Sequence, residues 1–319
     1  MIMVTTSDNS RADRTLVEAL EETAAGLLER HLATTREWFP HALIPWTSAV
    51  DYDDDYEWDP ADATVPPAVR SALFVNVLTE DNLPYYFRDI ERMFGRDGAW
   101  GEWVRRWTAE EGRHGMVLNT YLQATRAVDP VDLERARMIQ VQTGAVPEPP
   151  NAAEGLAYVS LQELATRISH FNTGGLLEDP VGRQIMRRVA SDENLHFLFY
   201  RDAFSAIIEI DPSMAVMAIE KQTVNFAMPG VGIPGFNSHA KAIADAGIYD
   251  LAIHHDQILQ PVIMRDWAVE SIEGLSPEAE ASRERLLKYI SRVGKVGARL
   301  ASRREEKAAR AAEREPTPV

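Results

Sequence analysis

Apolar side chains recur every three or four residues along most of the chain, which is the spacing of one buried face on an α-helix. No series of short alternating apolar and polar runs separated by turn signals interrupts this pattern, so we expect an all-α protein. The pattern predicts helices over residues 13–38, 66–95, 99–127, 130–144, 152–178, 181–209, 212–226, 237–247, 250–273 and 277–310. The Pro-, Asp- and aromatic-rich segment 38–67 is predicted to be an ordered loop.

Four of the apolar stripes contain a glutamate within the apolar face. They are Glu80, Glu111, Glu163 and Glu193, and the positions three and four residues away are mostly Trp, Leu, Val, Met and Phe. A lone buried carboxylate is costly because it loses its hydration. Four such stripes therefore predict that the carboxylates share a cation.

The four glutamates belong to a repeated pattern. Glu80 is followed 31 positions later by Glu111-x-x-His114, and Glu163 is followed 30 positions later by Glu193-x-x-His196. One Glu-x-x-His occurs often by chance, but two copies, each preceded by a glutamate at a matched distance, are specific. A glutamate from each of two helices and Glu-x-x-His from two others form the ligand set of ferritin-like di-iron bundles.

Composition narrows the chemistry further. The chain has no cysteine, so thiolate nucleophiles, disulfides and cysteine-ligated clusters are excluded, and a metal must be held by nitrogen and oxygen. The formal charge of −16 makes nucleic acid an unexpected partner. No run of about 20 apolar residues predicts a membrane span, and no secretory signal is evident, so we expect a cytoplasmic protein.

The domain organisation is predicted to be simple. Residues 1–300 are expected to form one ferritin-like helical domain, and residues 301–319 a charged, disordered C-terminal tail. Pro84 lies four residues after Glu80 and is expected to kink the helix there, because proline has no N–H for the carbonyl of Glu80. His254-His255-Asp256 is interpreted as structural, since adjacent residues do not share a helix face.

Four segments resemble the soluble acyl-carrier-protein desaturases. Residues 107–115 (WTAEEGRHG) resemble the first Glu-x-x-His motif of that family, residues 192–196 (DENLH) the second, residues 79–84 (TEDNLP) its first ligand helix and residues 162–173 its third. The likeness runs from about Trp38 to Ile272. Gly112 and Leu195 depart from the asparagine and the basic residue that many members have at these positions.

The resemblance implies a role for each matching residue. Glu80, Glu111 and His114 would serve one of two iron ions, and Glu163, Glu193 and His196 the other, with Glu111 and Glu193 bridging the two. Thr166 would lie beside the oxygen-binding face and help to handle protons. Asp192 would accept a hydrogen bond from a ligand histidine. Trp46 would match a tryptophan on the route of electrons to the metals.

The function implied by this resemblance is O₂-dependent desaturation. A di-iron desaturase would introduce a cis double bond into a saturated acyl chain on acyl carrier protein, in fatty acid biosynthesis, using a ferredoxin-type electron donor and acting as a homodimer. Two other classes keep the same ligand set. One is a di-iron oxygenase, a hydroxylase or N-oxygenase, whose substrate is free of carrier protein; the other is an iron-storage or inert helical bundle.

Docking requires a local basic patch, because carrier proteins and ferredoxins are usually acidic and so is this chain. Three clusters are candidates: Arg88, Arg92 and Arg96 at steps of four; Arg105 and Arg106; and Arg299, Arg303, Arg304, Lys307 and Arg310 near the C-terminus. Each is also compatible with an ordinary solvated helix face.

Overall fold

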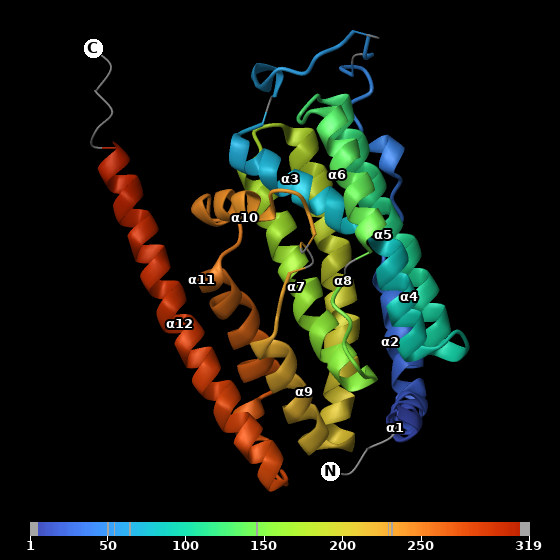
Figure 1. Cartoon of the computed structure of the whole chain (residues 1–319). Coiled ribbons are helices and arrows are strands. Elements are labelled where there is room, and N and C mark those ends of the chain that lie inside the picture. Colours follow the sequence, from blue (N-terminus) through green and yellow to red (C-terminus); the bar gives the residue numbers. More distant parts are fainter. Residues whose placement is uncertain are drawn as a thin grey trace.

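The computed structural model describes residues 6–49, 51–53, 55–63, 65–144, 146–228, 230 and 232–312. Within these ranges every regular element is a helix, which confirms the all-α prediction (Figure 1). The longer helices are α1 (Thr6–Ala19), α2 (Glu21–Thr34), α3 (Pro67–Glu80), α4 (Leu83–Phe94), α5 (Gly98–Ala124), α6 (Pro130–Thr143), α7 (Ala152–Leu176), α8 (Pro180–Ile210), α9 (Pro212–Val224), α10 (Phe236–Asp245) and α12 (Pro277–Ala312).

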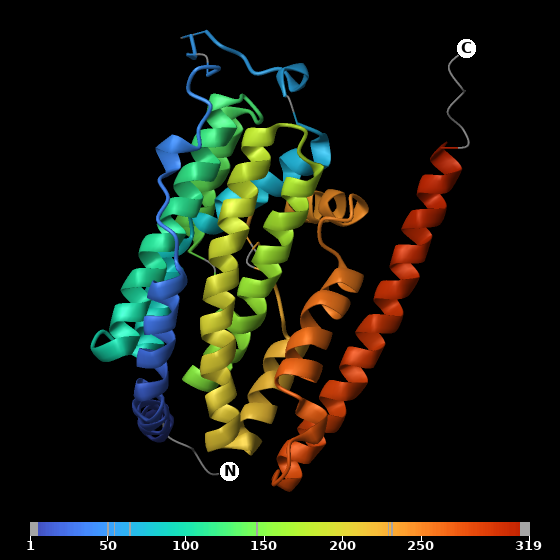
Figure 2. The same ribbon diagram turned by 180° about the vertical axis from the view of Figure 1, so that it is seen from behind.

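The centre of the fold is the bundle formed by α3, α5, α7 and α8. A three-residue turn joins α7 to α8, and the two helices lie side by side (Figures 1 and 2). Asp179 begins α8 by accepting hydrogen bonds from the backbone N–H groups of Val181, at 3.0 Å, and Gly182, at 2.9 Å. Gly182 allows α5 to pack closely against the start of α8, because a Cβ at this position would lie 2.4 Å from the hydroxyl of Tyr121.

The chain breaks after Glu80, where a kink was predicted. The helix α3 ends at Glu80 and α4 begins at Leu83, so the irregularity is larger than a kink. The N–H of Asp81 still donates to the carbonyl of Val77, four residues earlier. The N–H of Asn82 donates instead to the carbonyl of Thr79, three residues earlier, so the α-helical hydrogen bonding ends here. Pro84 cannot donate to the carbonyl of Glu80. The break leaves Glu80 as the last residue of α3.

Two other predicted helices are divided. The predicted helix 13–38 is α1 and α2, which meet at Leu20, and it ends at Thr34. The predicted helix 250–273 is a short α11 (Leu251–His254), a π-helical segment η3 (His255–Asp266) and a 3₁₀ turn η4 (Val269–Ser271). Pro261 lies inside η3, where its missing N–H disfavours regular α-helical bonding.

The C-terminal helix α12 continues to Ala312, so the first part of the predicted tail 301–319 is helical. The remainder of that predicted tail lies outside the described residues. Along its first half α12 packs against α9, and α11 and η3 lie against it as well. Figures 1 and 2 show it as a long rod at the edge of the molecule.

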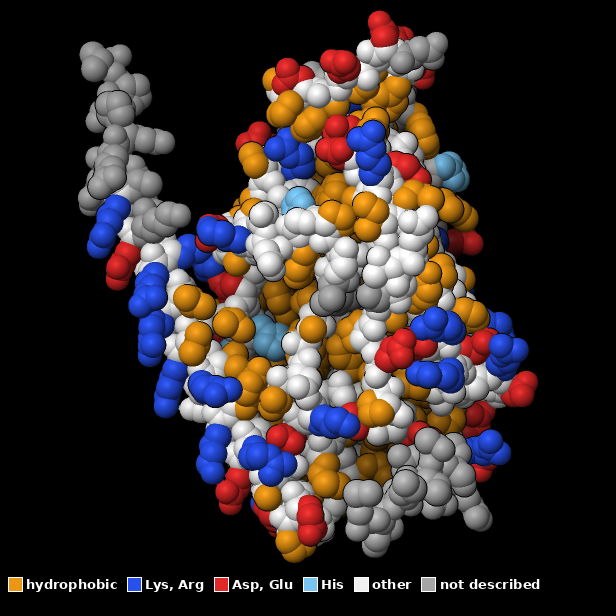
Figure 3. All heavy atoms as spheres, in the orientation of Figure 1, with side chains coloured by type: hydrophobic (Ala, Val, Ile, Leu, Met, Phe, Trp, Pro, Cys, Tyr) orange, Lys and Arg blue, Asp and Glu red, His pale blue; other side chains and the backbone are white. Residues whose placement is uncertain are grey.

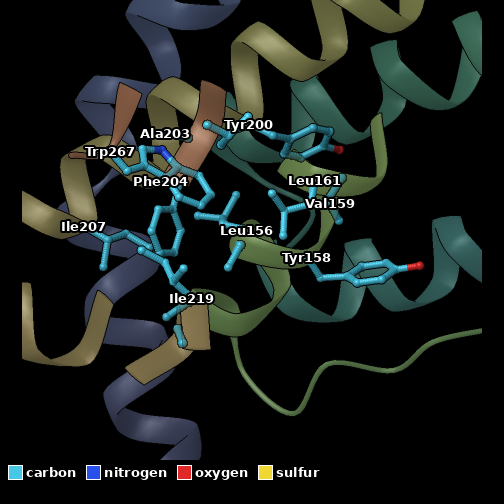
Figure 4. Close-up of a cluster of buried hydrophobic side chains, with 14 of the residues drawn as sticks. Leu156, Tyr158, Val159, Leu161, Tyr200, Ala203, Phe204, Ile207, Ile219 and Trp267 are labelled. Atoms are coloured by element: carbon cyan, nitrogen blue, oxygen red, sulfur yellow. The ribbon is translucent and has the colours of Figure 1, made fainter. Parts of the chain in front are cut away.

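Two apolar clusters hold the bundle together. The larger lies between α7, α8, α9 and η3, where Phe204 packs against Trp267 with ring centroids 4.4 Å apart (Figure 4). The smaller joins α3, α5 and the start of α8 around Leu73, Leu118 and Ile185. The metal-ligand candidates lie between these clusters, where little water can reach them. Among the described helices, none combines the length and apolar character needed to cross a membrane.

Candidate metal centre

The six predicted ligands converge from four helices. Glu80 ends α3, Glu111 and His114 lie on α5, Glu163 lies on α7, and Glu193 and His196 lie on α8. The Glu-x-x-His spacing places both side chains of each motif on the face directed into the bundle. All six side chains are buried, and both imidazoles have no exposed surface.

The six side chains form two groups that share members. In one, single oxygen or nitrogen atoms of Glu80, Glu111, His114 and Glu193 lie within 4.8 Å of one another, and in the other the same holds for Glu111, Glu163, Glu193 and His196. Glu111 and Glu193 belong to both groups. This is the arrangement that two cations with two shared carboxylates require, and it matches the division of ligands implied by the sequence resemblance.

The Nδ1 atoms of both histidines point into this cluster. His114 Nδ1 is 3.3 Å from Glu111 Oε2 and 3.4 Å from Glu193 Oε1. His196 Nδ1 is 2.8 Å from Glu111 Oε1 and 3.6 Å from Glu163 Oε2. Among the described residues, these two nitrogens, Glu111 Oε1 and Glu163 Oε2 have no hydrogen-bond partner. Buried polar atoms without a partner are uncommon, and a bound cation would satisfy them.

The electrostatics also fit a bound cation. Burial, and then the charge of Glu111, raises the pKa of Glu80 well above its usual value. Burial and the charge of Glu193 do the same to the pKa of Glu163. Divalent cations would offset this crowding of carboxylates. A donor set of imidazole and carboxylate without thiolate suits iron or manganese, so these residues fit a two-metal site.

Each Glu-x-x-His helix places a carboxylate beside the histidine of the other. The carboxylate just before Glu193, Asp192, has its Oδ2 3.5 Å from Nε2 of His114 on α5. The carboxylate just before Glu111, Glu110, has its Oε2 3.0 Å from Nε2 of His196 on α8. Both contacts leave Nδ1 free to face the cluster.

Glu110 was not among the predicted site residues. Its equivalence to Asp192 was visible in the sequence, since both acidic residues directly precede the glutamate of a Glu-x-x-His motif. His31 of α2 also contacts Glu110, with its Nε2 2.9 Å from Glu110 Oε2. Arg106 lies 2.5 Å from the other oxygen of Glu110. No spacing rule connects His31 to the motifs, so it could not be found from the sequence.

A different tryptophan from the predicted one lies beside the site. Trp46 is 56% exposed, and its indole N–H donates to the backbone carbonyl of His41. The buried indole of Trp38 instead donates to Asp192 Oδ2 at 2.7 Å, and its ring lies parallel to that of His114. The structure thus places Trp38, and not Trp46, beside the candidate ligands, and the role expected for Trp46 in electron transfer stays a prediction.

Thr166 contacts one of the carboxylates shared by both groups. Its hydroxyl lies 3.0 Å from Glu193 Oε2 and 2.9 Å from the backbone carbonyl of Glu163. A hydroxyl has only one proton, so donation to Glu193 competes with donation to the backbone. From α5, Trp107 donates its indole N–H to Glu163 Oε1 at 3.1 Å.

His170 is a further buried imidazole that the sequence interpretation did not assign. Its Nε2 is 3.3 Å from Glu80 Oε1, and its Nδ1 is 3.2 Å from the side-chain amide of Asn76. Burial lowers the pKa of His170 to about 4, so it is neutral at pH 7. It lies one turn after Thr166 on α7, at the edge of the ligand cluster.

Two cavities lie beside the ligands. One, of about 50 Å³, lies between α4 and α7 and is lined mainly by apolar side chains, including Leu83, Ile90 and Met93. The other, of about 150 Å³, lies between α3, α7 and α10 and includes Ile243 and Phe236 in its wall. Thr79, Glu80 and Thr166 line both cavities.

The remaining motif stays outside the site. His254 is buried and stacks against Phe226. Its Nδ1 shares a hydrogen bond of 2.8 Å with the hydroxyl of Tyr249. His255 pairs with Asp256 on the surface. Within the described ranges no potential metal group includes these residues, in agreement with their interpretation as structural.

Comparison with known proteins provides independent evidence about the family of this chain. A family model described as fatty acid desaturase matches residues 12–316. DesA1 of Mycobacterium tuberculosis H37Rv, provisionally named an acyl-ACP desaturase, is 40% identical over 288 residues, which cover 87% of this chain and 85% of that protein. The chloroplastic palmitoyl-ACP 4-desaturase 3 of Ophrys sphegodes is 31% identical over 304 residues, 89% of this chain and 76% of that one.

Among solved structures, the X-ray structure of DesA2 from Mycobacterium tuberculosis H37Rv, also provisionally named an acyl-ACP desaturase, matches with a TM-score of 0.68. The match covers 84% of this chain and 99% of that chain, at 24% sequence identity. At this identity the likeness concerns the fold, and it confirms the ferritin-like helical architecture.

Proposed function

Because this chain belongs to the fatty acid desaturase family, we propose that it is a di-iron desaturase acting on acyl chains carried by acyl carrier protein, in fatty acid biosynthesis. The reaction would remove two hydrogens from neighbouring carbons and leave a cis double bond. The observation that carries this proposal is the pair of ligand groups that share Glu111 and Glu193 beside two apolar cavities.

Glu80, Glu111 and His114 would hold one iron ion, and Glu163, Glu193 and His196 the other, with Glu111 and Glu193 shared. Bound there, the iron pair would supply the oxygen chemistry needed to break unactivated C–H bonds. The protein contributes the surroundings. Glu110 and Asp192 would hold Nε2–H of the two histidines and so keep Nδ1 unprotonated toward the metals.

The cavities would position the substrate. A saturated acyl chain offers no charge or hydrogen bond to recognise, so placing one pair of carbons beside the ligands depends on shape and proximity. The walls from α4 and α7 supply Leu83, Ile90 and Tyr158, and exclude water from the ligands. Thr166 would hold its hydroxyl proton between Glu193 Oε2 and the bound chain.

Electron balance implies a second partner. Taking two hydrogens from the chain and reducing O₂ to two waters requires two further electrons and two protons. We therefore include a ferredoxin-type electron donor in the proposal, with a homodimeric state and a cytoplasmic location. The names of the relatives support the carrier-bound substrate, since the orchid protein is named for palmitoyl-ACP.

A product assay tests the proposal against a di-iron oxygenase that takes free substrates. Iron-loaded, reduced protein is incubated with O₂ and either stearoyl carrier protein or free stearic acid, and the acyl products are analysed by mass spectrometry. Desaturation of the carrier-bound chain lowers its mass by two units. A gain of sixteen units would assign the protein to hydroxylation instead, and reaction of the free acid alone would contradict a carrier-bound substrate. The Glu111→Ala variant serves as the inactive control, and it should also lose the bound iron pair.

A further inference from the structure

The helix α12 carries a continuous basic stripe on an acidic protein. From residue 285 to residue 304 it contains no Asp or Glu and seven basic residues, namely Arg285, Lys288, Arg292, Lys295, Arg299, Arg303 and Arg304. The formal charge of the whole chain is −16. Figure 3 shows these Lys and Arg side chains ranged along the outer edge of the molecule. Such a concentration of one charge sign creates a local field opposite to that of the protein as a whole.

The stripe is less neutralised than the other basic clusters. On α4, Arg88 pairs with Asp89 at 3.0 Å and Arg96 with Glu91 at 2.9 Å. On α5, Arg106 pairs with the buried Glu110. On α12, Arg285, Lys288 and Arg304 pair with carboxylates, but Lys295, Arg299 and Arg303 are exposed and have no carboxylate partner among the described residues. Of the three basic clusters found in the sequence, the C-terminal one is therefore the most available to an acidic partner.

A groove opens beside this stripe. It has a volume of about 580 Å³ and lies between α12 and the segment from α10 to α11. Arg303 and Leu300 form one wall, and Phe226 and Tyr249 form the other. Leu300 and the nearby Val296 are exposed, at 47% and 37%. The groove thus combines apolar walls with charged residues of both signs. Asp245 and Asp250 line it as well, and Arg304 pairs with Asp250, whereas Arg303 has no carboxylate partner among the described residues.

The groove leads toward the metal-ligand candidates. It shares Met228 and Tyr249 with the cavity of about 150 Å³ that His170 and Ile243 also line. That cavity in turn shares Thr79, Glu80 and Thr166 with the cavity between α4 and α7. The groove beside α12, the cavity next to it and the cavity between α4 and α7 therefore lie in sequence, with these common wall residues between them.

We propose that an acidic acyl carrier protein docks on the basic stripe of α12 and feeds its acyl chain through this groove, past Glu80 and Thr166, into the cavity between α4 and α7. The inference rests on the proposed function and adds the docking surface and the direction of entry. A carrier protein presents its acyl group on a flexible arm that includes a phosphate, which Arg303 at the rim could meet. The methyl end would then lie near Met93, which lines that cavity.

Charge reversal tests the docking surface. The triple variant Lys295→Glu/Arg299→Glu/Arg303→Glu is compared with a matched variant, Arg135→Glu/Arg183→Glu/Arg187→Glu, whose exposed residues lie on α6 and α8 and undergo the same change in charge. We expect the stripe variant to raise KM for the acyl carrier by about tenfold or more, to leave kcat within about twofold, and to flatten the salt dependence of carrier binding. The matched variant should keep wild-type values.

Equal KM values for the wild type and the stripe variant would overturn the docking proposal. So would a raised KM for the electron donor alone, or a change in oligomeric state, because the stripe would then serve the donor or a second copy. These outcomes differ from a failure of the proposed function, in which the wild type itself would not desaturate the carrier-bound chain.

Site-specific crosslinking provides a test that does not depend on a folded triple variant. Since the chain has no cysteine, Arg303→Cys and Arg187→Cys each introduce one thiol that can carry a photoreactive group. Irradiation with purified acyl carrier protein should capture the carrier from position 303 and not from position 187. Equal capture from both, or capture from 187 alone, would contradict docking on α12.

The path through the groove can be tested separately. Ile243→Trp would fill the space between the groove and the ligands. We expect this variant to bind carrier protein and iron like the wild type but to lose at least about tenfold in kcat/KM with long acyl chains. Unchanged kcat/KM would contradict entry from the α12 side.

Discussion

Glu110 and His196 lie on different helices, 86 positions apart, and their side chains meet at 3.0 Å inside the bundle. Asp192 and His114 form the corresponding contact in the opposite direction, at 3.5 Å. Each motif therefore places a carboxylate beside the histidine of the other: Glu110 of α5 is within hydrogen-bond distance of His196, and Asp192 of α8 lies next to His114.

The variant Glu110→Gln should weaken iron binding. A glutamine cannot carry the negative charge that fixes the proton on Nε2 of His196, so Nδ1 would be less available to a metal. Loss of such a partner typically lowers metal affinity by about 10–100-fold. Competition with a coloured chelator measures the affinity, and Glu102→Gln, at an exposed position of the same helix, is the control. Wild-type affinity in Glu110→Gln would remove this residue from the site.

The metal-free protein should become more stable when Glu163 is replaced by Gln. Burial and the nearby Glu193 raise the pKa of Glu163, so ionisation of this group at neutral pH opposes folding. The uncharged amide has nearly the same shape and removes the repulsion, and we expect a gain of about 1–3 kcal/mol in the free energy of unfolding.

The same variant should reverse its effect when iron is present. Iron binds the native wild-type protein and stabilises it by mass action, whereas Glu163→Gln lacks one ligand and should gain less. Thermal unfolding of both proteins with and without iron measures this crossover. A Glu163→Gln protein that is less stable than the wild type without metal would contradict this prediction. It would show that repulsion between the carboxylates is not the main destabilising interaction at the site.

The ligands could be predicted from the sequence because a helix converts spacing into position. Glu111 and His114 must share a face wherever α5 lies, and an apolar stripe around them requires that face to be buried. The break after Glu80 was visible for a similar reason, since Pro84 removes one specific hydrogen bond. These signals come from residues that lie close together in the sequence. The structure differs from the predictions here only in that the chain breaks after Glu80 instead of kinking.

The outer residues could not be predicted, because they depend on how distant segments pack. His31 reaches Glu110 across 79 positions, and only the docking of α2 on α5 brings them together. Trp38, rather than Trp46, meets Asp192 because the irregular segment after α2 follows no period that a sequence displays. The prediction of one helix over 250–273 did not take account of Pro261, which lies inside the π-helical segment η3 that packs against α12.

The hydroxyl of Thr166 should affect turnover more than metal binding. The variant Thr166→Val keeps the shape of the side chain but removes the donor to Glu193 Oε2, and Thr166→Ser restores it. We expect Thr166→Val to retain its iron and to lose about 10–100-fold in kcat, whereas Thr166→Ser stays within about threefold of the wild type. Iron analysis together with a product assay separates the two effects. Loss of iron in Thr166→Val would indicate that this hydroxyl mainly supports Glu193 as a ligand.

Acid should destabilise the protein through His254 of α11, which belongs to none of the potential metal groups of the described residues. Burial, and then the neighbouring charge of His255, lowers the pKa of His254 from 6.5 to about 4. Between these values the unfolded chain binds a proton at this residue and the folded chain does not. Stability from this residue is therefore fully present above pH 6.5 and is lost as pH falls toward 4.

The variant His254→Gln isolates this contribution, since glutamine does not titrate in this range and can still bond the hydroxyl of Tyr249. A depression of about 2.5 pKa units corresponds to a loss on the order of 3 kcal/mol between pH 6.5 and 4. Urea unfolding across this range, performed without metal, should show the wild type losing that much more stability than His254→Gln. Subtracting the two curves cancels the ligand histidines, which titrate in both proteins. Parallel curves would mean that water reaches His254 and that the groove beside α12 is wetter than its walls imply.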